Sequence, residues 1–367
     1  MLKILSLHEL LKKGVREGVF PGAVLGILYK RSTYLLSAGY SSLTPFLEPM
    51  EEGLIFDLAS LTKPLATGLI LIKLLQEGMD LDLEKPLGYY ISAKEPLSQI
   101  PLFRFLNHTS GLKAWYPFYK EGPLHLEKIY EMIQNLPLEY SPGSRCLYSD
   151  LNFFLITYFL EKLTGASFEK LFEEAKKKLF FTKKEVLLFN PLKKGVDQER
   201  IVPTSYDPER KKILRGIVED ENTRALGGVS GVAGLFGNIY GVLKVLESFL
   251  SAYLGESAAF KRDIIRYFFE FKDSVSDFAL IFMRQSFSSY SATGGSLSPS
   301  SIGHLGYTGC SFFIDLERHL IIILLSNRVH PQRGNELIKE FRPLLHRKII
   351  EMLEGRVRGD ESIIKCR

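Results

Sequence analysis

Hydrophobic residues in this chain repeat with the period of a β-strand near both ends and with the period of a helix in between. Near the start, residues 23–29 and 33–37 are apolar stretches on either side of a tight turn at residues 30–32, which predicts two adjacent strands. Three more short strands are predicted near the end, over residues 306–308, 311–315 and 319–326. Strands from both ends of a chain favour one antiparallel sheet. The predicted fold class is therefore α+β, with helices flanking the sheet and a mainly helical region inserted into it.

Helical periodicity sets the other boundaries of the fold. Residues 1–18 and 335–354 predict helices beside the sheet, and the pattern from Ser60 to about residue 250 is mainly helical. The clearest helical stretches within that span are residues 151–163, 167–180 and 242–254. The predicted division of this single unit is a sheet region of residues 1–58 and 240–355, a mainly helical insertion of residues 59–239 and a polar tail of residues 356–367.

Composition excludes several classes of protein. With 46% hydrophobic and 24% charged residues, the chain has an ordinary globular composition. A net charge of +5 without a dense Lys/Arg stripe predicts no nucleic-acid partner. Three cysteines make no disulfide framework, and neither His-Glu-x-x-His nor Cys-x-x-Cys occurs, so no metal or other cofactor is expected. The absence of a long uncharged apolar run predicts no membrane span, and the absence of a secretory signal predicts a cytoplasmic location, or a periplasmic one if the start is misassigned.

The most specific chemical signal is the segment Ser60-Leu61-Thr62-Lys63. On a helix, residues three apart are surface neighbours, so the Lys63 amine can reach the Ser60 hydroxyl and help to activate it as a nucleophile. Three other Ser-x-x-Lys matches begin at Ser110, Ser167 and Ser362. Only Ser60 lies between a short strand-like stretch, residues 54–58, and a long apolar helix that runs to about residue 78. The alternative is that Ser60 caps this helix, as Ser167 is expected to cap its own.

Two later segments supply candidate partners for Ser60. Tyr148 lies between a turn and the helix of residues 151–163; beside a Lys ammonium its phenolate form would be favoured, which makes it a candidate general base. His304 and Gly306 open the last set of strands, where a backbone N–H could pair with that of Ser60 as an oxyanion hole. The alternatives are a packing tyrosine and a half-exposed histidine at the start of a strand. The glycine-dense residues 227–237 indicate close backbone approach or tight turns rather than a phosphate loop.

In this order and spacing, these segments resemble the serine β-lactamase and penicillin-binding-protein superfamily. The most similar branch comprises class C β-lactamases, D-alanyl-D-alanine carboxypeptidases and related esterases. Its three motifs, Ser-x-x-Lys, Tyr-x-Asn and Lys-Thr-Gly or His-x-Gly, correspond here to Ser60–Lys63, Tyr148-Ser149-Asp150 and His304-Leu305-Gly306. Weaker similarities include Asn107-His108-Thr109-Ser110-Gly111 and Asp220-Glu221-Asn222, and the resemblance covers roughly residues 15–350.

The resemblance implies acyl transfer without a cofactor. Ser60 would attack a carbonyl carbon, while Lys63 and Tyr148 share the proton transfers, with the identity of the base left open. The N–H groups of Ser60 and Tyr307 would hold the oxyanion, and His304 would supply hydrogen bonds and partial positive charge near Tyr148. The expected substrate is a small molecule or short peptide with an ester, amide or lactam bond.

Two departures from the family pattern bear on the substrate. Asp150 stands in place of Asn and, when ionised, only accepts hydrogen bonds; it could instead pair with Lys63. Leu305 stands in place of Thr and cannot bind a substrate carboxylate; with Asp150 and Gly306 it is expected to line the substrate site. We therefore predict an esterase or amidase with weak or no β-lactamase activity. The alternatives are a true class C β-lactamase, a D-amino-acid or D-Ala carboxypeptidase, and a non-catalytic penicillin-binding-like sensor.

Overall fold

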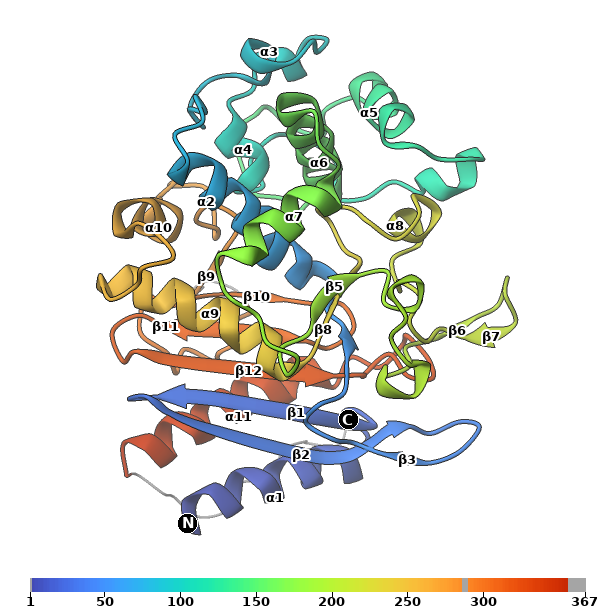
Figure 1. Ribbon diagram of the computed structural model, residues 1–367, viewed down its shortest axis with the longest axis vertical. Coiled ribbons are helices and arrows are strands. Elements are labelled where there is room, and N and C mark those ends of the chain that lie inside the picture. Colours follow the sequence, from blue (N-terminus) through green and yellow to red (C-terminus); the bar gives the residue numbers. More distant parts are fainter. Residues whose placement is uncertain (1, 286–289, 356–367) are drawn as a thin grey trace.

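A seven-stranded antiparallel sheet built from both ends of the chain forms the base of the molecule (Figure 1). The computed structural model describes residues 2–285 and 290–355. The strands lie in the order β3-β2-β1-β12-β11-β10-β9. Their bounds are β1 Gly22–Tyr29, β2 Ser32–Ser42, β3 Glu48–Pro49, β9 Met283–Arg284, β10 Ile302–Leu305, β11 Ser311–Asp315 and β12 Leu320–Ser326. Because β1 pairs with β12, the two ends of the chain meet in the middle of the sheet, and the predicted α+β fold is confirmed.

Alternation along β1 explains why both faces of the sheet are covered. Successive strand side chains point to opposite faces. Ala23, Leu25 and Ile27 are buried in one hydrophobic cluster with helices α1 (Leu2–Arg16) and α11 (Ile338–Leu353). Val24 and Leu28, which point to the other face, belong to a second cluster that includes residues of α9 (Ile239–Leu254) and of the rest of the helical region. The sheet therefore separates two cores, one against the terminal helices and one against the inserted region (Figure 1).

The inserted region packs helices above this second face (Figure 1). Its helices and the one that follows α9 are α2 Leu69–Gln76, α3 Leu87–Tyr90, α4 Leu102–Leu106, α5 Leu126–Asn135, α6 Asp150–Thr164, α7 Phe168–Lys177, α8 Glu221–Ala225 and α10 Arg262–Glu270. It also contains a small sheet of β4 Phe56–Asp57, β8 Leu235–Gly237 and β5 Leu187–Phe189, and a hairpin of β6 Tyr206–Asp207 and β7 Lys212–Ile213. The predicted boundaries after residues 58 and 239 stay a prediction.

Most predicted elements are confirmed to within a few residues. The turn between β1 and β2 has positive φ at Lys30 (48°) and Arg31 (67°), as a two-residue hairpin turn requires. Helix α6 ends at Gly165 in the left-handed conformation. The Ser167 side chain accepts a hydrogen bond from the backbone of Lys170, so its predicted role as a cap of α7 is confirmed.

One strand prediction is wrong. Residues 306–308 form a turn, and the strand comes earlier as β10. Gly309 has a φ of 110°, and its N–H donates to the carbonyl of Gly306, which closes the turn before β11. The predicted polar tail, residues 356–367, lies outside the described residues, as does Ser362. In the part of the chain that the structure describes, every helix is too short or too polar to cross a membrane.

Candidate active site

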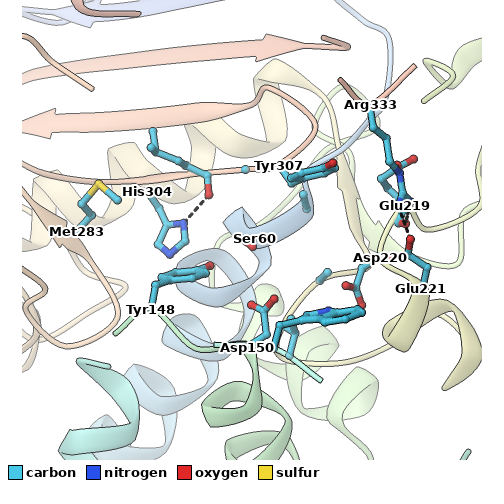
Figure 2. A pocket seen from close by; sticks show the side chains of 16 residues that line it. Ser60, Tyr148, Asp150, Glu219, Asp220, Glu221, Met283, His304, Tyr307 and Arg333 are labelled. Carbon is cyan, nitrogen blue, oxygen red and sulfur yellow. Dashed lines mark hydrogen bonds and ion pairs between the residues drawn. The ribbon is translucent and has the colours of Figure 1, made fainter. Parts of the chain in front are cut away.

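Ser60 lies in a tight 3₁₀ turn, Ala59–Leu61, between β4 and the start of the long helix (Figure 2). Ala59 before it has a φ of 47°, a left-handed conformation that costs free energy for a residue with a side chain. The buried Asp57 carboxylate stabilises this turn by accepting the Ala59 N–H at 2.8 Å. Ser60 therefore sits inside a strained turn and is not the helix cap that the alternative interpretation suggested.

Lys63 is completely buried beneath Ser60, at the start of a π-helical segment, Lys63–Gly68. Its ammonium donates to three oxygens: Ser60 Oγ at 3.1 Å, Asp150 Oδ1 at 2.7 Å and the Val232 carbonyl at 3.2 Å. All three N–H donors of the ammonium are thereby satisfied. Burial opposes the charge on Lys63, but Asp150 and Tyr148 together outweigh it and hold the pKa of Lys63 above its usual range. The predicted pairing of Asp150 with Lys63 is confirmed.

The glycine-dense segment explains how a backbone carbonyl reaches Lys63. A Cβ at Gly231 would lie 2.6 Å from Thr67 Oγ1 and 2.8 Å from Thr157 Oγ1, so only glycine fits there. The Gly231 N–H donates to Thr157, and Thr67 donates to the Gly231 carbonyl. This contact holds the next residue, Val232, against Lys63, and the predicted close backbone approach is confirmed.

A loop of residues 108–114 holds Tyr148 and Asp150 in place. His108 Nδ1 accepts the backbone N–H of Ser149 at 3.0 Å, and its ring lies 4.5 Å from the ring of Tyr148. The N–H of Asp150 donates to the carbonyl of Ala114 at 2.9 Å, which fixes the first residue of α6. The second predicted motif is therefore anchored by the histidine-containing segment that precedes it.

Tyr148 and His304 differ electrostatically from what the sequence predicted. Burial raises the pKa of Tyr148 despite the opposing effect of Lys63, so the expected stabilisation of a phenolate is wrong in direction. His304 is completely buried, and burial lowers its pKa to about 3. The partial positive charge expected for His304 is therefore wrong, and so is the alternative of a half-exposed histidine. Its Nδ1–H donates to the carbonyl of Leu305 at 2.8 Å, which leaves Nε2 as an acceptor.

The turn after β10 packs directly against the turn that carries Ser60. A Cβ at Gly306 would lie 2.8 Å from the carbonyl oxygen of Leu58, so a larger residue would push the two turns apart. Thr308 Oγ1 donates to the carbonyl of Asp57 at 2.8 Å and ties the same two segments together. Tyr307, which lies between these contacts, is thereby brought to the same cavity as Ser60 (Figure 2).

One cavity of about 630 Å³ unites the predicted residues. Those that line it are Ser60, Tyr148, Asp150, His304, Leu305, Gly306 and Tyr307, with Lys63 buried below. The lining also contains residues that sequence reasoning did not select, namely Trp115, Glu219, Asp220, Glu221, Met283 and Arg333. Asp220 and Glu221 carried a weak signal in the Asp-Glu-Asn similarity, and Trp115 is the chain's single tryptophan. The remaining three lie in segments without a distinctive motif.

Comparison with known proteins identifies the family. A family model described as Beta-lactamase matches residues 7–344. The chain belongs to the β-lactamase family. It is 32% identical over 308 residues to a protein of Escherichia coli (strain K12) named putative D-alanyl-D-alanine carboxypeptidase, over 76% of this chain and 70% of that relative. It is 30% identical over 363 residues to the N-acetylmuramyl-L-alanine amidase of Bacillus subtilis (strain 168), over 89% of this chain and 81% of that relative.

A solved structure supports the same fold at lower identity. EstCE1, described as a hydrolase with promiscuous acyltransferase activity, superimposes with a TM-score of 0.73 at 18% identity, over 95% of this chain and 98% of EstCE1. The predicted superfamily and fold class are confirmed, and this β-lactamase family member has hydrolases among its relatives and structural neighbours.

Proposed function

We propose that this β-lactamase family member is a serine hydrolase that forms an acyl-enzyme on Ser60 and cleaves an ester or amide bond. The observation that carries the proposal is the 3.1 Å contact from the Lys63 ammonium to Ser60 Oγ at the floor of the cavity. A serine hydroxyl becomes a useful nucleophile only when a neighbouring group takes its proton. The strained turn at Ala59 supports the proposal, because such strain is common at functional sites.

The hydrogen bonds around Lys63 suggest a path for the Ser60 proton. Lys63 carries a full set of protons, so it accepts the Ser60 proton only as it passes one of its own to Asp150, 2.7 Å away. Tyr148, a neutral phenol, then donates its proton to the leaving group. In the second half-reaction the Tyr148 phenolate takes a proton from water, and Asp150 returns its proton through Lys63 to Ser60. Every group ends in its starting state.

The backbone N–H groups of Ser60 and Tyr307 are the proposed oxyanion hole. Such donors stabilise the charge that develops on the carbonyl oxygen in the transition state. Two contacts support this role, because Gly306 and Thr308 hold the Tyr307 turn against residues 57–58, in the segment that leads to Ser60. These contacts tie the turn that carries the Tyr307 N–H to the segment that carries the Ser60 N–H.

The charges in the cavity favour an ester or amide over a substrate with a free carboxylate. Of the described residues, the cations at this cavity are Lys63, which is bound to Asp150, and Arg333, which is bound to Glu219 and Glu221. His304 stays neutral, because its pKa is about 3. Carboxylates bind to available cationic donors, and these are already engaged.

The names of two relatives support cleavage of amide bonds, and one of them suggests a second candidate function. The amidase of B. subtilis matches 89% of this chain. The E. coli relative is named as a putative carboxypeptidase, which makes a D-alanyl-D-alanine carboxypeptidase the second candidate. That activity requires recognition of a terminal carboxylate, so the engaged cations Lys63 and Arg333 count against it.

Covalent labelling tests the proposal directly. A fluorophosphonate probe is expected to label the wild-type protein, and mass spectrometry is expected to find the adduct on Ser60. Ser60→Ala should abolish both labelling and the turnover of p-nitrophenyl esters. Ser167→Ala is the matched control: it alters another Ser-x-x-Lys serine and should cost about 1 kcal/mol of stability through the lost cap while leaving labelling intact.

Three outcomes contradict the proposal in different ways. Labelling that survives Ser60→Ala would move the nucleophile elsewhere, for example to Ser110, since burial raises the pKa of the Cys310 thiol to about 11 and makes it unreactive. No labelling and no turnover of any ester or amide would favour a non-catalytic sensor. Efficient nitrocefin hydrolysis without ester turnover would favour a true β-lactamase.

A further inference from the structure

The side of the cavity opposite His304 is lined by three consecutive acidic residues, Glu219, Asp220 and Glu221, which we call the acidic wall (Figure 2). Arg333 bonds to the carboxylates of Glu219 and Glu221 and so neutralises part of their charge. Asp220 has no such cation. One of its oxygens accepts the backbone N–H of Thr223 at 2.7 Å, and no ion pair to Asp220 occurs among the described residues.

Asp150 faces the acidic wall across the cavity. Its charge acts on Asp220: burial first and the Asp150 carboxylate second raise the pKa of Asp220 to about 6. The Lys63 ammonium donates both to Asp150 and to Ser60. The Asp150 carboxylate therefore lies next to the proposed nucleophile, with the ammonium between them. Two carboxylates, Asp150 with Lys63 as its cation and Asp220 without one, thus line the same cavity as Ser60.

A buried acceptor without a partner is a second, independent sign of what the cavity binds. His304 Nε2 is buried on the side of the cavity opposite the acidic wall (Figure 2) and has no hydrogen-bond partner among the described residues. Because His304 Nδ1 donates to Leu305, Nε2 can only accept. A buried polar atom without a partner costs free energy, so a ligand that supplies a donor gains affinity there.

Trp115 adds an aromatic surface to the same cavity. Its side chain is 44% exposed, so part of the indole is open to a ligand in the cavity. Tryptophan is the best of the aromatic side chains for attracting a cation to its ring face. The carboxylates and the exposed indole favour the same cationic group, and the acceptor at His304 favours a hydrogen-bond donor elsewhere on the same ligand.

We propose that this cavity selects substrates whose acyl group carries a protonated primary amine, bound between Asp150 and Asp220 and against Trp115. The inference rests on the proposed acyl transfer at Ser60 and names the substrate class of that site. An ammonium provides the hydrogen-bond donors and the positive charge that this side of the cavity lacks. A free carboxylate in the same position would be repelled.

Three p-nitrophenyl esters of equal chain length test this proposal. The 3-aminopropanoate carries an ammonium where the butanoate carries a methyl group, and the hemisuccinate carries a carboxylate. The expected order of kcat/KM is ammonium, then methyl, then carboxylate, with about tenfold between the first two. Asp220→Asn and Trp115→Ala should each lower the ratio of the ammonium ester to the methyl ester, whereas Trp115→Phe should keep most of it.

Asp263→Asn is the matched control, because Asp263 is an exposed carboxylate on α10 and makes the same change of charge. It should leave the ratio unchanged. A wild-type ratio of one or less, or a ratio that Asp220→Asn does not lower, would overturn the amine proposal.

Binding without turnover separates this proposal from the proposed function. Calorimetry with the Ser60→Ala protein should show that 3-aminopropanamide binds more tightly than butanamide, and Asp220→Asn in the same background should remove the difference. If no ester is cleaved but this difference appears, the hydrolase proposal fails and amine recognition stands. Equal binding of the two amides would overturn amine recognition whatever the turnover results.

Discussion

The floor and the acidic side of the cavity satisfy their charges in different ways. On the floor, the Lys63 ammonium has three oxygen partners within 3.2 Å and is completely buried, so every donor is used. On the acidic side, Arg333 compensates the charges of Glu219 and Glu221, whereas the Asp220 carboxylate accepts the Thr223 N–H but has no cationic partner among the described residues. A charge that is fully compensated is suited to a fixed chemical step, whereas a carboxylate without a cation is suited to binding a cationic group brought by a ligand. We therefore assign the reaction to the floor of the cavity and the choice of substrate to its acidic side.

The largest expected effect tests the floor. Lys63→Met keeps most of the side-chain volume but removes the ammonium, so kcat/KM for p-nitrophenyl butanoate should fall by about 10³-fold. Lys170→Met is the matched control, because Lys170 is the exposed lysine of the Ser-x-x-Lys segment that begins at Ser167 and continues into α7. Activity within a factor of ten of wild type would show that the 3.1 Å contact to Ser60 has no role in catalysis.

The next effect tests how the floor is joined to the turn after β10. Gly306→Ala places a methyl group 2.8 Å from the Leu58 carbonyl and should move the Tyr307 N–H away from the oxyanion, lowering kcat by about 10²-fold. Gly53→Ala, at an exposed glycine with open space around it, should leave kcat unchanged. Thermal unfolding of both variants separates a displaced turn from a loss of folding, and unchanged kcat in a folded Gly306→Ala protein would contradict the proposed oxyanion hole.

Asp150 lies between the floor and the acidic side, so its substitution should affect both the reaction and the choice of substrate. The expected effect is smaller than those of the Lys63 and Gly306 substitutions. Asp150→Asn removes the acceptor of the proposed proton path and restores the usual family residue, which can donate to an amide carbonyl. The ratio of nitrocefin turnover to butanoate ester turnover should therefore rise by about tenfold. An unchanged ratio would mean that Asp150 has no part in the selection of the substrate.

The smallest expected effect is a pH dependence confined to the acidic side. Asp220 is negative above its pKa of about 6 and neutral below it, under the influence of Asp150 and Glu221, with Glu219 and Arg333 beside them. The preference for the ammonium ester over the methyl ester should therefore fall as the pH decreases from 8 to 5, by about threefold. His304 does not titrate in this range, because its pKa is about 3. The Asp220→Asn protein should show a flat ratio, and a flat ratio in wild type would contradict this assignment.

Local spacing predicted the elements whose geometry depends on neighbours in the chain. Ser60 and Lys63 are three residues apart in a helical segment, so their contact follows from the geometry of a helical turn. The cap at Ser167 and the end of α6 at Gly165 are local in the same sense. The strand at residues 306–308 was misplaced because its apolar pattern is short, and a contact with the distant residue Leu58 fixes that segment as a turn.

The order of the motifs predicted which residues share the cavity, but not their charges. Tyr148 was expected to favour its phenolate form and His304 to carry partial positive charge. Burial of both side chains reverses these expectations, because a charged group loses the stabilisation by water. The degree of burial depends on packing with segments far away in the chain, which no local pattern contains.

The sequence alone determined the family, the α+β fold and the candidate nucleophile, since hydrophobic period, helical spacing and motif order are properties of the chain itself. The tertiary structure alone decided which charges remain unpaired beside that serine. Residues 115, 150, 219–221 and 333 meet only when the inserted region folds onto the sheet. The electrostatic character of the cavity depends on distances and burial, and these exist only in the folded molecule.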